Sequence, residues 1–332
     1  MNIAKVAYRS LLSAGIVGLM ASVASCSSKT DNTQATEKTP EETTAKASRG
    51  QGSVVDKSND ATLQTMIKEV LPKFKQAEYK DPTTGKTMQY NLFTPANAQS
   101  GKKYPVVMFI ADASTANKDV TAPLSQGYGA LIWAVDSLQA KNPCYVLVPQ
   151  FTGVAVNDAY EHSDEVDIAA RLLKKVATDK NADTNRLYAT GQSMGGMISM
   201  YYNVAYPDLL AASIFVDCHW DPATFDELVK HKFIFFIAGD EGKAYADLKP
   251  LETAAEKEGV QYTFAEWSAK LPETTQNGLA GVMLEKGAPI NIFEFETGSV
   301  LPDGVEAPDH MYSFDYAYKI PSVRDWLFKQ KK

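Results

Sequence analysis

The sequence has few of the residues that build metal centres or disulfide frameworks. It contains three cysteines and four histidines among 332 residues. It has neither a Cys-x-x-Cys pair nor a His-Glu-x-x-His motif, the closely spaced ligand sets on which zinc sites rely. We therefore expect no metal and no other cofactor. Cys144 begins one predicted strand and Cys218 follows the end of another, so we expect no disulfide between them.

An excess of positive charge is also missing. The 33 Lys and Arg residues are outnumbered by 40 Asp and Glu residues, which gives a net charge of −7. Proteins that follow a nucleic-acid backbone rely on clustered cations, so we expect no nucleic-acid partner. The composition is 45% hydrophobic and 22% charged, close to the average for globular proteins, and it predicts a sizeable core.

The chain lacks an apolar run long enough for a permanent membrane-spanning helix. Its N-terminal apolar run covers residues 11–25 and follows two cations, Lys5 and Arg9, which is typical of a secretory signal peptide. The run ends in Val23-Ala24-Ser25-Cys26, which resembles the lipobox of bacterial lipoproteins. In that motif the cysteine receives lipid and becomes the first residue of the mature chain. The resemblance implies that residues 1–25 are a lipoprotein signal peptide.

The resemblance also implies an envelope location. A lipid anchor on Cys26 would be the only attachment to a membrane, and Ser27 after it favours the outer membrane by resemblance to lipoprotein sorting. Residues 26–60 are rich in Thr, Ser, Lys and Glu and poor in apolar side chains, so they predict a flexible polar tether. Residues 61–332 are the right length for one catalytic domain of the α/β class.

Strand and helix patterns alternate along residues 61–332. Continuous apolar runs such as Pro105–Ala111 are typical of strands buried on both faces. The alternation predicts a mostly parallel central sheet with helices on both faces. The expected strands are Phe74–Lys80, Met88–Phe93, Pro105–Ala111, Cys144–Pro149, Arg186–Thr190, Ala212–Asp217, Phe233–Ala238, Gln261–Trp267 and Ile290–Phe295, the first two forming a hairpin. The expected helices are Ala61–Leu71, Ala130–Gln139, one capped by Ser163, one from Met194, one near Phe225, Ala246–Glu258 and Ser313–Phe328.

One motif concentrates the chemistry. Gly191-Gln192-Ser193-Met194-Gly195 has the form G-x-S-x-G and lies between a predicted strand and a predicted helix. In that context the chain turns sharply and exposes the serine hydroxyl, and the glycines avoid collisions with neighbouring backbone. We therefore expect Ser193 to be a nucleophile. The backbone N–H of Met194, at the start of the helix, is expected to face a developing oxyanion.

A serine nucleophile needs a base and an orienting acid, which follow it in the order acid, then base. Three of the four histidines do not fit this order. His162 precedes Ser193, and His231 begins a strand at the wrong end of the sheet. His219 follows the strand directly after the nucleophile helix, which leaves no room for an acid between them. His310, in a polar loop before the last predicted helix, is the expected base.

The acid is expected directly after the strand Phe233–Ala238, which indicates Asp240. Glu241 is adjacent to it and could also reach the base. An aspartate in this position could instead simply form the turn that follows Gly239.

The run Asn185-Arg186-Leu187-Tyr188-Ala189-Thr190-Gly191-Gln192-Ser193-Met194-Gly195-Gly196-Met197 resembles the α/β-hydrolase superfamily. The resemblance is greatest to bacterial esterases related to polyhydroxybutyrate depolymerases, feruloyl and acetylxylan esterases, and prolyl-oligopeptidase-like enzymes. The segment from His310 to Phe328 resembles the C-terminal histidine segment of the same group. This implies an α/β-hydrolase fold and a carboxylesterase with a Ser-His-Asp triad.

The chain departs from this family at one point. Relatives carry His-Gly after the strand that precedes the oxyanion loop, whereas this chain has Ala111-Asp112. By analogy the second oxyanion donor is the backbone N–H of Ala113. Phe151, His219 and Trp220 follow predicted strands and are candidates to line the substrate mouth.

Two other functions remain open from the sequence. One is a peptidase of the prolyl-oligopeptidase type. The other is a catalytically silent lipoprotein that keeps the fold to bind glycans or peptides, because a fold does not guarantee an activity. The expected partner of an active enzyme is a small-molecule or polymeric ester.

Overall fold

The computed structural model describes residues 55–96, 98–99, 101–239 and 242–332. The predicted signal peptide and Cys26 lie outside these residues, as do Asp240 and Glu241. The predicted boundaries at residues 25 and 60 stay predictions.

The last residues of the predicted tether bind the folded part of the chain. Lys57 forms an ion pair with Asp315 at 2.7 Å, and both side chains are largely buried. Asp60 caps helix α1 (Ala61–Val70) by accepting a hydrogen bond from the backbone of Leu63, and it also accepts one from the Tyr128 hydroxyl. Tyr128 and Asp315 belong to different helices, so this short segment holds two helices of the domain together.

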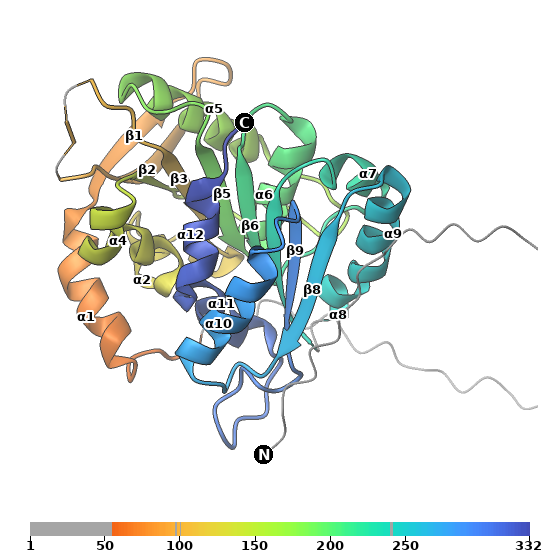
Figure 1. Cartoon of the computed structure of the whole chain (residues 1–332). Coiled ribbons are helices and arrows are strands. Elements are labelled where there is room, and N and C mark those ends of the chain that lie inside the picture. Colours follow the sequence, from red (N-terminus) through yellow and green to blue (C-terminus); the bar gives the residue numbers. More distant parts are fainter. Residues whose placement is uncertain (1–54, 97, 100, 240–241) are drawn as a thin grey trace, which may run out of the picture.

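One sheet of nine strands runs through the described residues in the order β1-β2-β4-β3-β5-β6-β7-β9-β8 (Figure 1). Strands β1 and β2 form the predicted antiparallel hairpin, and β2 also pairs antiparallel with β4. Every other pair is parallel, which confirms the predicted mostly parallel sheet. The strands are β1 Lys75–Lys80, β2 Thr87–Phe93, β3 Val106–Ile110, β4 Tyr145–Pro149, β5 Leu187–Gln192, β6 Ala212–Val216, β7 Phe233–Ala238, β8 Tyr262–Trp267 and β9 Ile290–Phe295.

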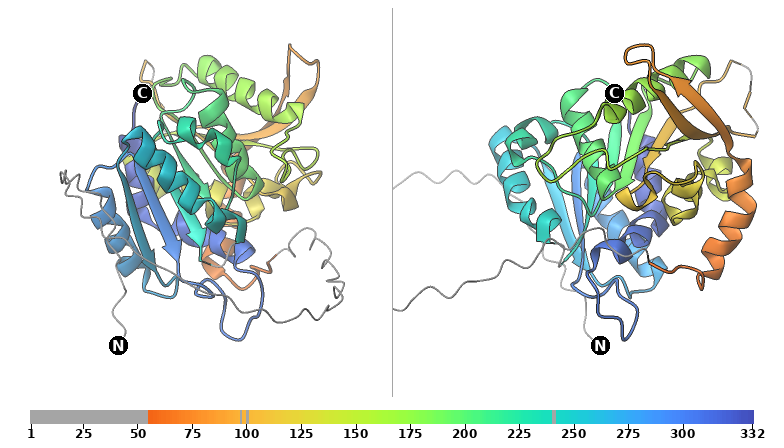
Figure 2. Two further views of the ribbon diagram at one scale, coloured as in Figure 1. Left: turned by 90° about the vertical axis from the view of Figure 1, so that its right-hand side faces the viewer. Right: turned by 180° about the vertical axis from the view of Figure 1, so that it is seen from behind.

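Helices cover both faces of the sheet, as predicted (Figures 1 and 2). Successive residues of a strand point to opposite faces. In β3, Val106 and Met108 therefore pack in the core on one side, while Val107 and Phe109 pack on the other. The first side is covered by α5 Asp164–Asp179, α6 Met194–Ala205, α7 Phe225–Leu228, α8 Gly242–Ala246 and α9 Leu248–Glu258. The second side is covered by α1, α3 Tyr128–Leu131, α4 Asp136–Lys141, α10 Glu273–Leu284, α11 His310–Lys319 and α12 Pro321–Lys329, with the short helix α2 Ala122–Ser125 preceding α3.

Three predicted helices are interrupted, so their predicted bounds are wrong. The stretch 130–139 is divided because Val135 has an extended backbone, with ψ of 144°, between the short helix η3 (Ile132–Ala134) and α4. The stretch 313–328 is divided because Pro321 lacks a backbone N–H and clashes with a continuing helix, so it starts α12 instead. The stretch 246–258 is divided at Asp247, which separates α8 from α9.

Two further helical features differ from the prediction. Helix α10 was not predicted, because its Thr and Gly residues favour helix weakly. Packing against β8 and α12 stabilises it instead, and Met283 and Ala280 are buried there. Ser163 precedes α5 as expected, but its side chain forms no capping hydrogen bond. The acidic residues of the first turn, including Asp164 and Glu165, lie at the positive end of this helix.

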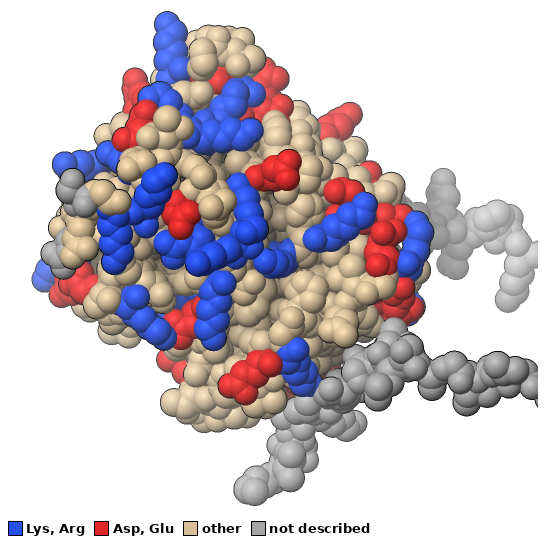
Figure 3. Space-filling view, turned by 45° about the horizontal axis from the view of Figure 1, so that its top comes forward, with Lys and Arg blue, Asp and Glu red and all other residues tan. Residues whose placement is uncertain are grey.

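The surface at the N-terminal ends of the parallel strands is basic. Figure 3 looks toward this end of the molecule, and Lys and Arg side chains gather across its middle with fewer acidic side chains between them. The C-terminal tail belongs to this face, because the backbone N–H of Lys332 donates to Asn185, two residues before β5. Within the described ranges, none of the helices has the length and apolar character needed to cross a membrane.

Candidate active site

Ser193 lies at the sharp turn between β5 and α6, in a strained conformation. Its φ of 50° and ψ of −119° fall in a region that residues with a side chain rarely adopt. Such a conformation costs on the order of 1–2 kcal/mol, and it persists only where the surroundings enforce it. One enforcing contact is the hydrogen bond from the Ser193 backbone N–H to the carbonyl of Val216, at 3.0 Å, on the neighbouring strand β6.

The glycines of the motif are required by close backbone contacts, as the sequence predicts. A Cβ at Gly191 would overlap the backbone of Gly195, and a Cβ at Gly195 would overlap the carbonyl oxygen of Ile110 at the end of β3. A Cβ at Gly196 would lie 2.5 Å from the Sγ of Cys218. Backbone atoms cannot move aside as the end of a flexible side chain can. The turn that carries Ser193 therefore tolerates no side chain at Gly191 or Gly195.

His310 reaches Ser193 from the opposite face of the sheet. It is the first residue of α11 and not part of the preceding loop, which corrects its predicted placement. Its Nε2 lies 2.9 Å from the Oγ of Ser193, within hydrogen-bond distance. The loop before it is held by Asp309, whose buried carboxylate accepts a hydrogen bond from the backbone of Gly298 at 2.7 Å. The two residues that the sequence places 117 positions apart thus form one pair.

The surroundings of His310 favour the neutral imidazole. Burial lowers its pKa to about 4, against an ordinary value of 6.5. The carboxylate of Asp112 acts in the opposite direction and raises the pKa, while His219 lowers it further. A neutral imidazole at neutral pH can accept a proton from a serine hydroxyl.

The segment expected to supply the acid follows β7, two strands from β5 in the sheet. Strand β7 ends at Ala238, and the backbone N–H of Gly239 donates to the carbonyl of Phe295 at 2.7 Å. Asp240 and Glu241 come next and lie outside the described residues, so the choice between them stays a prediction.

Two backbone N–H groups are candidates to bind an oxyanion. Met194 is the first residue of α6, and Ala113 is the first residue of the short helix η2 (Ala113–Thr115) that follows β3. At a helix start the N–H has no partner within the helix. Among the described residues, no acceptor is hydrogen-bonded to either group. Both strands β3 and β5 end at the same edge of the sheet, next to each other.

The loop after β3, which carries the candidate donor Ala113, is built around Asp112. Its buried carboxylate accepts a hydrogen bond from the backbone of Ser114 at 2.6 Å, which caps η2. It also accepts hydrogen bonds from the side-chain amides of Gln126 and Gln192, the latter at 3.2 Å. Sequence reasoning missed this network, because no short-range signal links residues 112, 126 and 192. The Asp112 side chain thus holds the loop after β3 to Gln126 and to the end of β5.

The three candidate lining residues differ in accessibility. Phe151 and Trp220 are each 3% exposed and pack in the core, Trp220 against the ring of Tyr160. His219 is less enclosed, and its Nε2 lies 3.1 Å from Asp158 in the loop after β4. Asp158 also pairs with Lys243 of α8. Substrate contact stays a prediction for all three.

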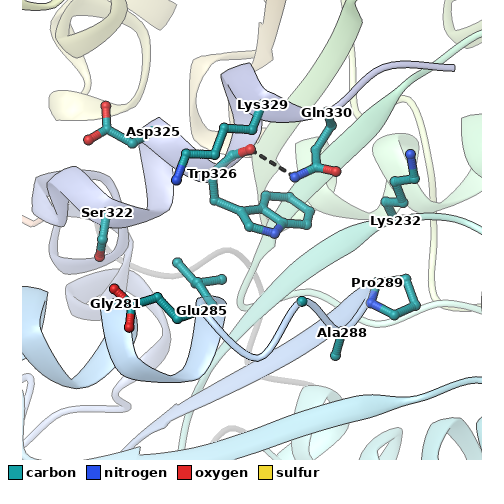
Figure 4. A pocket seen from close by; sticks show the side chains of 12 residues that line it. Lys232, Gly281, Glu285, Ala288, Pro289, Ser322, Asp325, Trp326, Lys329 and Gln330 are labelled. Carbon is teal, nitrogen blue, oxygen red and sulfur yellow. Dashed lines mark hydrogen bonds between the residues drawn. The ribbon is translucent and has the colours of Figure 1, made fainter.

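A cavity of about 410 Å³ lies at the other end of the sheet (Figure 4). Lys232 before β7 and Pro289 before β9 place it at the N-terminal ends of the strands. Its lining also includes Trp326, Lys329 and Glu285. Ser193 and His310 are absent from this lining, so the cavity is separate from the candidate site.

The free thiols agree with the sequence analysis. Cys144 and Cys218 are both buried and form no disulfide. Cys144 packs in the core on the α12 side of the sheet and Cys218 in the core on the α6 side. Burial raises the pKa of the Cys144 thiol to about 12, so this thiol is inert at neutral pH.

No protein-family description and no curated protein sequence matches this chain. Solved structures do match. A thermostable esterase superposes with a TM-score of 0.65 at 23% sequence identity, over 79% of this chain and 64% of that one. This chain thus spans less than two thirds of that esterase. A mutant of the feruloyl esterase module from Clostridium thermocellum, complexed with sinapinate, superposes with a TM-score of 0.52 at 12% identity, over 76% of this chain and 88% of that one.

Sequence identities this low support a shared fold but do not show a shared activity, which has to be argued from the residues of the site. The strand order, the strand–serine–helix turn and these structural neighbours agree with one another. The chain has the α/β-hydrolase fold.

Proposed function

We propose that this protein is a serine hydrolase that cleaves carboxylic esters. The observation that carries the proposal is the 2.9 Å approach of His310 Nε2 to the Oγ of a strained Ser193. An isolated serine hydroxyl is a weak nucleophile near neutral pH, and an adjacent base is what activates it. The esterase and feruloyl esterase structures that share the fold support the ester as the bond attacked.

Each residue has a defined role in the proposed reaction. The Ser193 Oγ attacks the ester carbonyl carbon while His310 Nε2 takes its proton. The negative charge that develops on the carbonyl oxygen is bound by the backbone N–H groups of Met194 and Ala113. The tetrahedral intermediate collapses as the C–O bond to the alcohol breaks and His310 gives its proton to the departing oxygen. A water molecule then attacks the acyl carbon while His310 takes its proton. The bond to the Ser193 Oγ breaks, His310 returns the proton to Ser193, and the carboxylic acid leaves.

Asp240 is the proposed third member of a Ser-His-Asp triad. Its carboxylate would hold the imidazole in the tautomer that presents Nε2 to Ser193. Its position in the chain, after the last residue of β7 and between the serine and the histidine, supports this role. Glu241 is the alternative acid.

A covalent probe tests the nucleophile directly. The purified protein should be labelled stoichiometrically by a fluorophosphonate, with the adduct on the peptide that contains Ser193. Labelling should vanish in Ser193→Ala and fall steeply in His310→Ala. Ser213→Ala, which removes a buried serine hydroxyl in β6, is the matched control and should label normally. A folded protein that binds glycans or peptides without any labelling would be a silent binding protein instead.

A substrate panel separates the esterase from the peptidase. Short-chain aryl esters, acetylated sugars and feruloyl esters are compared with peptide amides. We expect turnover of esters, including acyl groups carried on glycans, and little or none of amides. Faster cleavage of prolyl peptides would assign the protein to the prolyl-oligopeptidase type.

We also propose that Cys26 carries a lipid anchor in the cell envelope, with the outer membrane as the site. The lipobox-like sequence before Cys26 supports this. Cys26→Ser should move the protein from the membrane fraction to the soluble fraction without loss of ester hydrolysis. Membrane association that persists in this variant would exclude the anchor.

A further inference from the structure

Asp217 is a buried aspartate with an unusual backbone next to the candidate site. It follows the last residue of β6, its side chain is fully buried, and its φ is 40°. Its neighbour Val216 accepts the hydrogen bond from the backbone of Ser193. Two strained residues, Ser193 and Asp217, thus lie directly after the adjacent strands β5 and β6, whose last residues Gln192 and Val216 are paired. Strain at a position that has no part in the proposed chemistry needs an explanation.

The carboxylate of Asp217 joins three segments of the chain. One oxygen accepts a hydrogen bond from the backbone N–H of Ala238, at 2.7 Å, at the end of β7. The other accepts a hydrogen bond from the hydroxyl of Ser313, in the first turn of α11. Asp217 itself is tied to β7 by the bond from its own N–H to the carbonyl of Phe236, at 2.9 Å. The ends of β6 and β7 and the start of α11 therefore meet at a single side chain.

Ser313 connects this arrangement to His310. The serine is 1% exposed, and its Oγ also lies 2.9 Å from the carbonyl oxygen of His310. A hydroxyl has one proton to donate, and a charged carboxylate is the stronger acceptor. The position of the first turn of α11 relative to the sheet is thus set by the bond to Asp217.

We propose that Asp217 and Ser313 are positioning residues that hold His310 at reacting distance from Ser193. This inference rests on the proposed function. The imidazole is fixed to the first turn of α11, while Ser193 is fixed to the ends of β5 and β6. The Asp217–Ser313 hydrogen bond is a buried link between these two parts at the first turn of α11, the turn that carries His310. A displacement of about 1 Å between reacting groups can reduce a rate by about 10²-fold.

The same carboxylate also holds the end of β7. Ala238 is the last residue of that strand, and its backbone N–H donates to Asp217 at 2.7 Å. Asp217 thus joins β7, which the expected acid follows in the chain, to the helix that carries His310.

Two variants test the proposal, with one matched control. Ser313→Ala removes only the hydroxyl, and Asp217→Asn keeps the shape while removing the charge. Ser213→Ala removes an equally buried hydroxyl that accepts a hydrogen bond from Asn203 at 2.8 Å, near the N-terminal end of β6. Each purified variant is checked for folding by circular dichroism and thermal unfolding. The assays are turnover of an aryl acetate and the rate of fluorophosphonate labelling.

We expect kcat to fall by about 10-fold in Ser313→Ala and by about 10²-fold in Asp217→Asn, with KM within about twofold of wild type. The labelling rate should fall in the same proportion, because it also depends on the approach of His310 to Ser193. The double variant should lose little more than Asp217→Asn alone, because the two side chains act through one bond. Ser213→Ala should keep both rates within about twofold, even if its stability falls.

Equal kcat in folded Ser313→Ala and Ser213→Ala would overturn the positioning role. So would a loss of kcat that follows thermal stability across all three variants. If Asp217→Asn does not fold, Ser313→Ala decides alone. A wild-type protein that is neither labelled nor active would overturn the proposed function and this inference together, so the two failures are distinguishable.

Discussion

The two ends of the parallel sheet differ in backbone conformation. At the C-terminal ends of the strands, the loops that follow β3, β4, β5 and β6 each contain one non-glycine residue with positive φ: Asn117, Tyr160, Ser193 and Asp217. At the N-terminal ends, Asn181 is the only such residue among those described. Strained backbone therefore gathers at the end where His310 meets Ser193, as expected where a site is held in one geometry.

The two ends also differ in their side chains. Near the site, His310, Asp217 and Glu294 place titratable groups in buried surroundings. The opposite end carries solvated lysines, and its cavity has Lys232 and Lys329 in its lining (Figures 3 and 4). This cavity therefore does not mark the end of the sheet where His310 meets Ser193. Strain and buried titratable groups identify the end that holds the proposed chemistry.

The largest effect that would sharpen this comparison is expected at Asp240. Asp240→Asn should lower kcat by about 10³–10⁴-fold, because the histidine would be held in the wrong tautomer. Lys329→Ala at the opposite end should leave kcat unchanged. Steady-state ester hydrolysis measures both. Normal turnover in Asp240→Asn, together with a collapse in Glu241→Gln, would move the role of the acid one residue along.

A pair of glycine substitutions compares the turn at the site with a helix distant from it. Gly195→Ala should destabilise the protein by several kcal/mol or abolish activity, because its Cβ would overlap the carbonyl oxygen of Ile110. Gly278→Ala in α10 meets no atom within 4 Å and should raise the free energy of unfolding by about 1 kcal/mol. Denaturant unfolding monitored by fluorescence measures both changes. Equal effects would mean that the turn is less constrained than its contacts indicate.

The sequence predicts the fold well because its signals are local. Apolar runs and the G-x-S-x-G turn are short-range patterns, so the strands and the environment of Ser193 are recognisable without a structure. The break between α11 and α12 is a local signal too, because Pro321 favours the start of a new helix. The contacts of Asp112 with Gln126 and Gln192, and of Asp217 with Ser313, join residues far apart in the chain. Pairings of this kind depend on tertiary packing, which no local pattern encodes.

The pH dependence of ester hydrolysis should show the buried state of His310. Only the neutral imidazole accepts the proton of Ser193, so activity is lost as pH falls through the pKa of the folded protein. With that pKa lowered to about 4, kcat/KM at pH 5.5 should stay close to its value at pH 7.5. If His310 had an ordinary pKa of 6.5, kcat/KM at pH 5.5 would be about a tenth of its value at pH 7.5. An acid limb centred near pH 6.5 would contradict the lowered pKa of His310.

The smallest expected effect is on the free energy of unfolding, and it compares Glu294 near the candidate site with Glu285 at the opposite end of the sheet. Burial, and then the charge of Glu266 on the neighbouring strand, raise the pKa of Glu294 to about 7. A raised pKa means that the folded protein favours the neutral acid, so the stability this residue contributes is full below about pH 4.5 and is lost as pH rises through 7. Glu294→Gln keeps the shape without the charge and should raise the free energy of unfolding at pH 8 by about 1–3 kcal/mol, with little change at pH 4.5. Glu285→Gln, on the exposed rim of the opposite cavity, should change stability by less than about 0.5 kcal/mol at either pH. Chemical denaturation at the two pH values measures the difference, and equal responses of the two variants would show that Glu294 is as solvated as the surface glutamate.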